Sequence, residues 1–254
     1  MSAGEIVAIA SAGVAAGMIN TVVGSGTLIT FPVLLAFGYA PVTANVSNTV
    51  GLVPGSVSGA IGYRRELAGQ AARARRLGVM SVAGGITGAV LLLELPASAF
   101  KAIVPAFIAA ALVLTLLQPR INSWLARRRR RDSDSVERGR VLTALAIYAT
   151  GVYGGYFGAA QGILLLAILG VALAQDLQRS NALKNVLAGL VNGVAGLYFV
   201  FAADVKWLPA ALIAGGSIAG AQLGARYGRR LPPRALRGLI VVVGVCAIVQ
   251  LMLL

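Results

Sequence analysis

The chain has 254 residues, of which 58% are hydrophobic, only 12% are charged and 32 are glycine. Because soluble domains contain roughly 25% charged residues, this composition excludes an ordinary soluble fold and predicts an all-α, polytopic membrane protein. The absence of histidine and the single cysteine, Cys246, exclude an imidazole-based zinc site, histidine catalysis and an internal disulfide.

The formal net charge of +14 arises from 22 Lys and Arg residues against eight Asp and Glu residues. Eighteen of the cationic residues fall in three segments: five in 64–76, eight in 120–140 and five in 226–237. These segments flank apolar spans and carry few aromatic residues for stacking on bases. They therefore indicate cytoplasmic loops of a multi-pass protein in a bacterial-type cell membrane, with both termini outside, and no binding of nucleic acid.

In chain order, the first half contains five apolar segments, approximately 6–22, 28–37, 43–63, 77–93 and 99–117. The N-terminus lacks the basic leader of a secretory signal, so we expect the first segment to be retained. The second segment is short. At 1.5 Å per residue it covers only about half of the ~30 Å hydrocarbon layer, which predicts a hairpin with a glycine-rich tip at membrane depth.

A second set of segments follows residue 140 and repeats features of the first set. Residues 136 positions apart match along most of each half, for example Gly26 with Gly162, Asn45 with Asn181, and Leu95-Pro96 with Leu231-Pro232. Such matches indicate internal duplication. The predicted domains are a first membrane repeat, 1–118, a basic cytoplasmic linker, 119–140, and a second membrane repeat, 141–254.

The charge distribution also predicts the relative orientation of the repeats. If all three basic segments lie on the cytoplasmic side, the two hairpins must enter the membrane from opposite sides. The repeats then have inverted topology, and their broken helical hairpins are expected to meet near the bilayer midplane.

The hairpin tips are the first candidate substrate site. A glycine-rich break before a helix leaves backbone N–H groups unpaired, and the helix dipole favours an anion there. The candidate tip residues are Gly24, Ser25, Gly26, Thr27, Gln161 and Gly162. The alternative is that these glycines only permit close helix packing, which is the interpretation favoured for Gly84, Gly88, Gly220 and Gly224.

The third segment of each half carries polar residues that a lipid-facing helix would exclude. Residues four apart share a helical face, which could line a cavity or form interhelical hydrogen bonds only. Lys184 is the only lysine inside an apolar segment, so it either contributes charge to the pathway or snorkels to the interface. The candidates in these segments are Asn45, Asn48, Thr49, Asn181, Lys184 and Asn185.

Other chemistry has no counterpart in the sequence. There is no Walker loop, dinucleotide-binding fingerprint or serine triad, so an enzyme, a cofactor or a metal site is not expected. The acidic residues nearest the spans fall at segment edges, which argues against a buried proton relay: Glu5, Glu66, Glu94, Asp176 and Asp204.

Residues 20–34, NTVVGSGTLITFPVL, followed by ANVSNT at 44–49, resemble the sulfite exporter TauE/SafE family, as does the duplicated layout. The resemblance implies a bacterial-type membrane transporter of sulfite, a sulfonate or a related organosulfur oxyanion. We expect a secondary transporter that works by alternating access. The expected partners are this small anion and membrane lipid. Two departures are Ser47-Asn48, where a Thr-Ser pair is expected, and the loosely matching second tip, 158–162. An anion channel and a non-transporting membrane scaffold are the alternatives.

Overall fold

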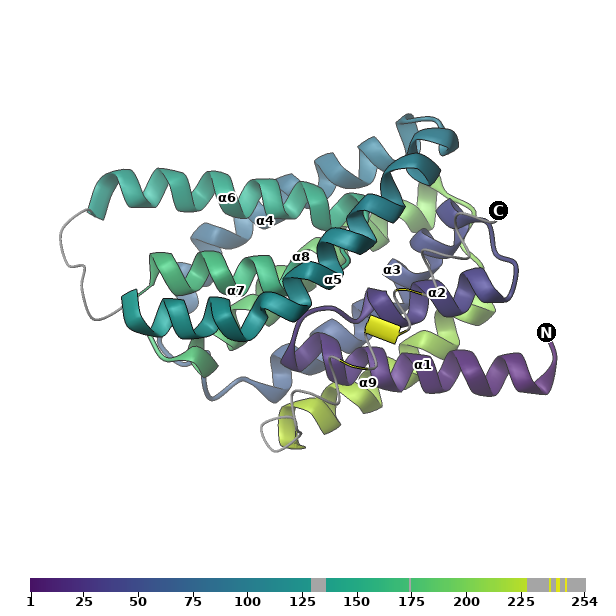
Figure 1. Ribbon diagram of the computed structural model, residues 1–254, viewed down its shortest axis with the longest axis horizontal. Coiled ribbons are helices and arrows are strands. Elements are labelled where there is room, and N and C mark those ends of the chain that lie inside the picture. The colour runs from purple at the N-terminus through teal and green to yellow at the C-terminus, as the bar shows by residue number, and fades with distance from the viewer. Residues whose placement is uncertain (129–135, 174, 228–237, 239–240, 243–244, 246–254) are drawn as a thin grey trace.

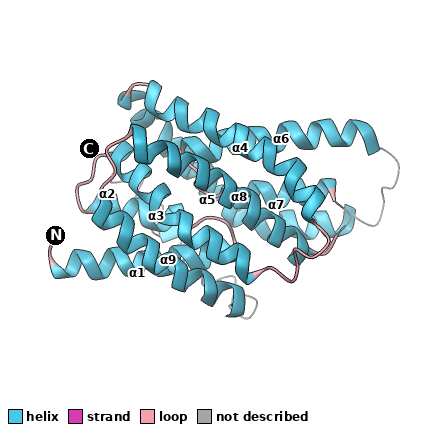
Figure 2. Ribbon diagram, turned by 180° about the vertical axis from the view of Figure 1, so that it is seen from behind, coloured by secondary structure: helices cyan, strands magenta, loops and turns pink. Residues whose placement is uncertain are grey.

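In the computed structural model of the chain, the described residues are 1–128, 136–173, 175–227, 238, 241–242 and 245. They form nine α-helices joined by loops, and no strand occurs among them (Figures 1 and 2). The helices are α1 (Ala3–Val22), α2 (Thr27–Ala36), α3 (Pro41–Gly62), α4 (Ala71–Glu94), α5 (Ala97–Arg128), α6 (Val136–Tyr156), α7 (Gln161–Ala172), α8 (Leu177–Ala202) and α9 (Trp207–Tyr227).

The helices confirm the predicted segments of the first half and the first four of the second. The fifth segment predicted after residue 232, with Cys246, lies almost entirely outside the described residues. Five described helices are long and apolar enough to cross a membrane: α1, α4, α5, α8 and α9. By contrast, α2 and α7 have 10 and 12 residues, which confirms that the second segment of each half is short.

The same helix order occurs twice, α1–α4 and α6–α9, but the spacing between equivalent residues changes along the chain. Helices α3 and α8, and α4 and α9, begin 136 residues apart. At the tips the spacing is 134, because Gly24 (φ 91°) is equivalent to Gly158 (φ 77°). Each glycine ends a helix in the left-handed conformation that glycine adopts without steric cost. The predicted match of Gly26 with Gly162 is therefore wrong.

One long helix from each half of the sequence packs against helices of the other half. Helix α9 packs against both α1 and α3, whereas α4 packs against both α6 and α8. Figure 1 shows α1 beside α9 and α4 beside α6. In this view α1 runs from right to left and α6 runs from left to right. We therefore define two packed units: the α1 unit, consisting of α1, α2, α3 and α9, and the α6 unit, consisting of α4, α6, α7 and α8.

Glycines make the packing inside each unit very close. An added Cβ at Gly220 or Gly224 would collide with the backbone of α1, and one at Gly84 or Gly88 would collide with the backbone of α6. These contacts confirm the packing interpretation for the four glycines, because only a hydrogen atom fits between the helices. Each unit is thus built around a tight helix pair.

The contact between the two units, along α3 and α8, is more open. An added Cβ at Gly189 would lie 3.5 Å from Ser56 Cβ, an ordinary van der Waals distance, and one at Gly193 would meet no atom within 4 Å. Asn192 Nδ2 donates a hydrogen bond to Ser56 Oγ across the contact (3.1 Å). At Gly196 an added Cβ would lie 2.9 Å from a side-chain atom of Val53, so the two units meet along a partly polar contact with fewer backbone collisions than occur inside each unit.

Candidate anion site at the hairpin tips

The two hairpin tips lie directly against each other. The backbone N–H of Gly162, in the first turn of α7, donates to the carbonyl oxygen of Gly24 (3.0 Å). An added Cβ at either glycine would overlap the backbone of the other tip, so this approach requires both glycines. The two tips, although far apart in sequence, therefore lie side by side.

The first hairpin keeps an open helix N-terminus, whereas the first backbone N–H groups of α7 are bonded, Gln161 N to Gly158 O (3.3 Å) and Gly162 N to Gly24 O. The first backbone hydrogen bond of α2 runs from Leu28 N to Ser25 O (3.2 Å), so the preceding N–H groups belong to the open end of the helix. Ala160, which precedes α7, has a φ of 58°. A non-glycine residue in this left-handed region stores roughly 1 kcal/mol of strain, and such strain often occurs at functional sites.

Three candidate side chains of α8 converge on the last turn of α1. Lys184 Nζ donates to the carbonyl oxygens of Asn20 (2.9 Å) and Thr21 (3.2 Å). Asn181 Nδ2 and Asn185 Nδ2 donate to the same Thr21 oxygen at 3.2 and 3.3 Å. Lys184 is only 1% exposed, so it does not snorkel to an interface. Instead it satisfies carbonyl groups that a helix end leaves unpaired.

The buried ammonium group of Lys184 is held by carbonyl oxygens rather than by a carboxylate. In the part of the chain that the structure describes, no acidic side chain forms an ion pair with it. The end of a helix provides only about half an elementary negative charge. The described surroundings of Lys184 therefore contain no carboxylate that would repel an anion.

The equivalent asparagines of the two halves have the same kind of partner. Asn45 Nδ2, on α3, donates to the carbonyl oxygen of Tyr156 in the last turn of α6 (2.9 Å). Asn181, on α8, donates to the last turn of α1 in the same manner. Each asparagine thus bonds the broken helix of the other packed unit, so these side chains do form interhelical hydrogen bonds.

Asn48, 136 residues before Lys184, contacts its own hairpin instead. Its Oδ1 accepts a hydrogen bond from Thr30 Oγ1, and its Nδ2 lies 3.4 Å from Thr27 Oγ1. Thr49 is buried on the same helix. The first hairpin therefore has a polar side built from hydroxyl and amide groups.

Several buried polar atoms next to the tip contact have no hydrogen-bond partner. They include Ser25 Oγ, Asn45 Oδ1, Gln161 Nε2 and Asn181 Oδ1. Ser25 and Gln161 are 1% and 3% exposed, respectively, and the Gln161 side chain lies against Gly154 of α6. A buried polar atom without a partner costs about 1–3 kcal/mol, so a group of them points to a ligand or to water that completes the site.

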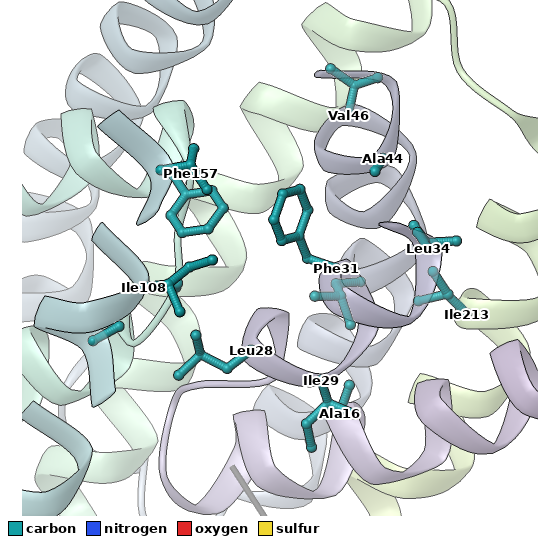
Figure 3. Close-up of a cluster of buried hydrophobic side chains, with 14 of the residues drawn as sticks. Ala16, Leu28, Ile29, Phe31, Leu34, Ala44, Val46, Ile108, Phe157 and Ile213 are labelled. Atoms are coloured by element: carbon teal, nitrogen blue, oxygen red, sulfur yellow. The ribbon is translucent and has the colours of Figure 1, made fainter. Parts of the chain in front are cut away.

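An aromatic cluster borders the tips on the side of α2 and α5. The rings of Phe31 and Phe157 meet edge to face with centroids 5.2 Å apart, and Leu28 and Ile108 lie beside them (Figure 3). The cluster consists of Phe31, Phe100, Phe107, Tyr153, Tyr156 and Phe157. The tips therefore have both an aromatic cluster and the Lys184 side chain among their neighbours.

Sequence reasoning missed part of this site. The carbonyl acceptors of Asn20 and Thr21 have no side-chain signature and are identified only by the fold. Thr30 was detectable, because it lies three residues after Thr27 on the same face of α2.

Helices long enough to span a bilayer, together with short helices that meet at glycine-rich ends, define a polytopic α-helical membrane protein. The model of the sulfite exporter TauE/SafE family matches residues 9–251. The chain belongs to this family of membrane transporters.

Three relatives support this assignment. "Probable membrane transporter protein ORF9" of Sinorhizobium sp is 27% identical over 93% of this chain and 88% of its own length. "Probable membrane transporter protein YfcA" of Escherichia coli (strain K12) is 25% identical over 90% of this chain and 82% of its own length. A "Probable membrane transporter protein" of Haemophilus influenzae is 26% identical over 84% of this chain and 81% of its own length. No solved structure matches the chain.

Proposed function

We propose that this protein is a secondary transporter that carries a small anion, a sulfite, sulfonate or related organosulfur oxyanion, by alternating access. The observation that carries the proposal is the buried Lys184 beside two contacting hairpin tips, without a carboxylate among the described residues to neutralise it. The open N-terminus of α2 and the unpartnered Ser25 Oγ and Gln161 Nε2 add hydrogen-bond donors of the kind that oxyanions prefer. The family name, sulfite exporter, supports the class of anion.

Anion binding is tested most simply by thermal stability. A ligand that binds only the folded state stabilises it by RT ln(1 + [L]/Kd), or about 2.7 kcal/mol at a concentration of 100 Kd. We expect at least one of sulfite, thiosulfate and sulfoacetate to raise the melting temperature of the purified protein by several degrees. Glucose and sodium, supplied as its chloride, serve as controls. Stabilisation by glucose alone, with no response to any of the anions, would contradict the proposal.

We further propose that the two halves are inverted-topology repeats with the basic segments in the cytoplasm. The partition of cationic residues supports this orientation, since 18 of 22 lie in three segments. Single cysteines at the exposed positions Ala97 and Asp204, in a version lacking Cys246, should react with a membrane-impermeant maleimide from outside the cell. A cysteine at exposed Ala68 should react only after permeabilisation. Labelling of Ala97 and Asp204 from different sides would contradict the inverted orientation.

For the movement itself, we propose that the α1 unit and the α6 unit, rather than the two halves of the sequence, move as bodies. The close glycine contacts within each unit resist relative movement, because displacement would cause backbone collisions. Between the units the tips approach closely at Gly24 and Gly162, whereas the α3–α8 contact has open space at Gly193 and meets a side chain, Val53, at Gly196. Rocking along this contact would expose the tips to each side of the membrane in turn.

A further inference from the structure

The last turn of α1 contains carbonyl oxygens that its own helix does not use. Both Val23 N and Gly24 N turn back to the carbonyl oxygen of Ile19, at 2.7 and 3.0 Å. The carbonyl groups of Asn20 and Thr21 are consequently left to other donors. The carbonyl oxygen of Gly24, just beyond the helix, likewise accepts a hydrogen bond from the other tip, from Gly162 N. Three carbonyl oxygens thus lie close together in sequence at the end of one broken helix.

The donors that satisfy these oxygens all come from the other packed unit. They are Lys184 Nζ, Asn181 Nδ2 and Asn185 Nδ2 on α8, and the backbone N–H of Gly162 on α7. One cation, two amides and a helix N-terminal N–H are a set of groups that would also coordinate an oxyanion. In this conformation the α1 carbonyl groups occupy that set.

We propose that the transported oxyanion binds by displacing the carbonyl oxygens of Asn20, Thr21 and Gly24 from these donors, so that the last turn of α1 is an internal competitor of the substrate. This inference rests on the proposed function, because it assigns the donor set to the same anion. These carbonyl groups also explain how Lys184 can be buried, because their dipoles replace water around its amino group.

Displacement has a structural consequence for the two units. The hydrogen bonds at the end of α1 join the α1 unit to the α6 unit, so an anion that takes over the donors releases one of their polar connections. The corresponding connection on the other side, from Asn45 to the Tyr156 carbonyl, contains one neutral amide. Substrate binding therefore loosens the charged connection selectively and leaves the neutral one intact.

Hydrogen–deuterium exchange distinguishes displacement from simple binding, because the two predict opposite changes in the exchange rate of the amides near the site. A ligand that is merely added to a site protects the neighbouring amides, whereas displacement frees the last turn of α1. The protein is placed in lipid nanodiscs and saturated with the anion, among sulfite, thiosulfate and sulfoacetate, that raises its melting temperature. We expect the amides of Val23 and Gly24 to exchange at least fivefold faster with this anion than without it. The Gly162 amide should remain protected, because the anion replaces its carbonyl partner.

Two variants make the test specific. Lys184→Met should exchange rapidly at Val23 and Gly24 even without anion and should show no further response to it. Asn192→Ala, on the same helix but bonded to Ser56, should respond as the wild type does. If an anion stabilises the wild type but slows or leaves unchanged the exchange of Val23 and Gly24, the displacement is wrong and the proposed function stands. If no anion of the three stabilises the protein, the proposed function fails, and the displacement fails with it.

Discussion

Replacing Lys184 with methionine is expected to lower the initial rate of anion transport at least tenfold, which corresponds to about 1.4 kcal/mol of lost interaction. Methionine keeps an apolar stem against Gly162 and α1 but removes the charge and the donors to Asn20 and Thr21. The amides of Asn181 and Asn185 still hold the Thr21 carbonyl, so the variant should insert and fold. Uptake by proteoliposomes containing equal amounts of protein measures the effect.

The matched control for this variant is Lys101→Met. Lys101 is exposed at the start of α5 and takes part in none of the tip hydrogen bonds described above, so its loss should leave the transport rate within about twofold of the wild type. Wild-type rate and wild-type apparent affinity in Lys184→Met would show that the buried cation only holds the end of α1. The anion would then have to bind through the tip donors alone, including Ser25 and Gln161.

A disulfide between cysteines at positions 56 and 189 is expected to reduce transport at least tenfold and reversibly. An added Cβ at Gly189 would lie 3.5 Å from Ser56 Cβ, which is within the range of disulfide geometry. The bond would join α3 of the α1 unit to α8 of the α6 unit, across the contact along which the units are proposed to move. Transport should be measured in a version lacking Cys246, before and after oxidation with copper phenanthroline.

The controls for the disulfide are the two single-cysteine variants, Ser56→Cys and Gly189→Cys, under the same oxidation. Each should transport at close to the wild-type rate, and addition of dithiothreitol should restore the double variant. Full transport by a quantitatively oxidised double variant would contradict movement along the α3–α8 contact. The units would then have to be redefined, although the anion site itself would remain.

The features of the fold that depend on local sequence could be predicted. Glycines around position 24 and the brevity of the following apolar segment identified the first hairpin, and the structure contains α2 with 10 residues there. Polar residues such as Asn45 in a long apolar segment identified α3 as part of the site. In both cases the signal is a residue type that the surrounding lipid or helix would otherwise disfavour.

The remaining features depend on contacts between distant segments, and local sequence does not determine them. Helix α4 packs on α6 and helix α9 packs on α1 through glycine-lined faces, and in both pairs the two helices come from different halves of the sequence. The spacing of 134 at the tips could not be read from matching glycines, because α7 has two more residues than α2. The partner of Lys184 is a pair of backbone carbonyl groups, which every residue carries.

The measurement that tests the central claim most directly is uptake of a radiolabelled anion into proteoliposomes reconstituted with the purified protein. We expect [³⁵S]sulfite, [³⁵S]thiosulfate or labelled sulfoacetate to enter at a rate that saturates with concentration, as a carrier with one site at the contacting tips requires. The rate should exceed that of protein-free liposomes and fall when unlabelled anion is added in excess. A rate indistinguishable from that of protein-free liposomes for all three anions, or a rate that rises linearly without saturation, would contradict transport of these anions by alternating access.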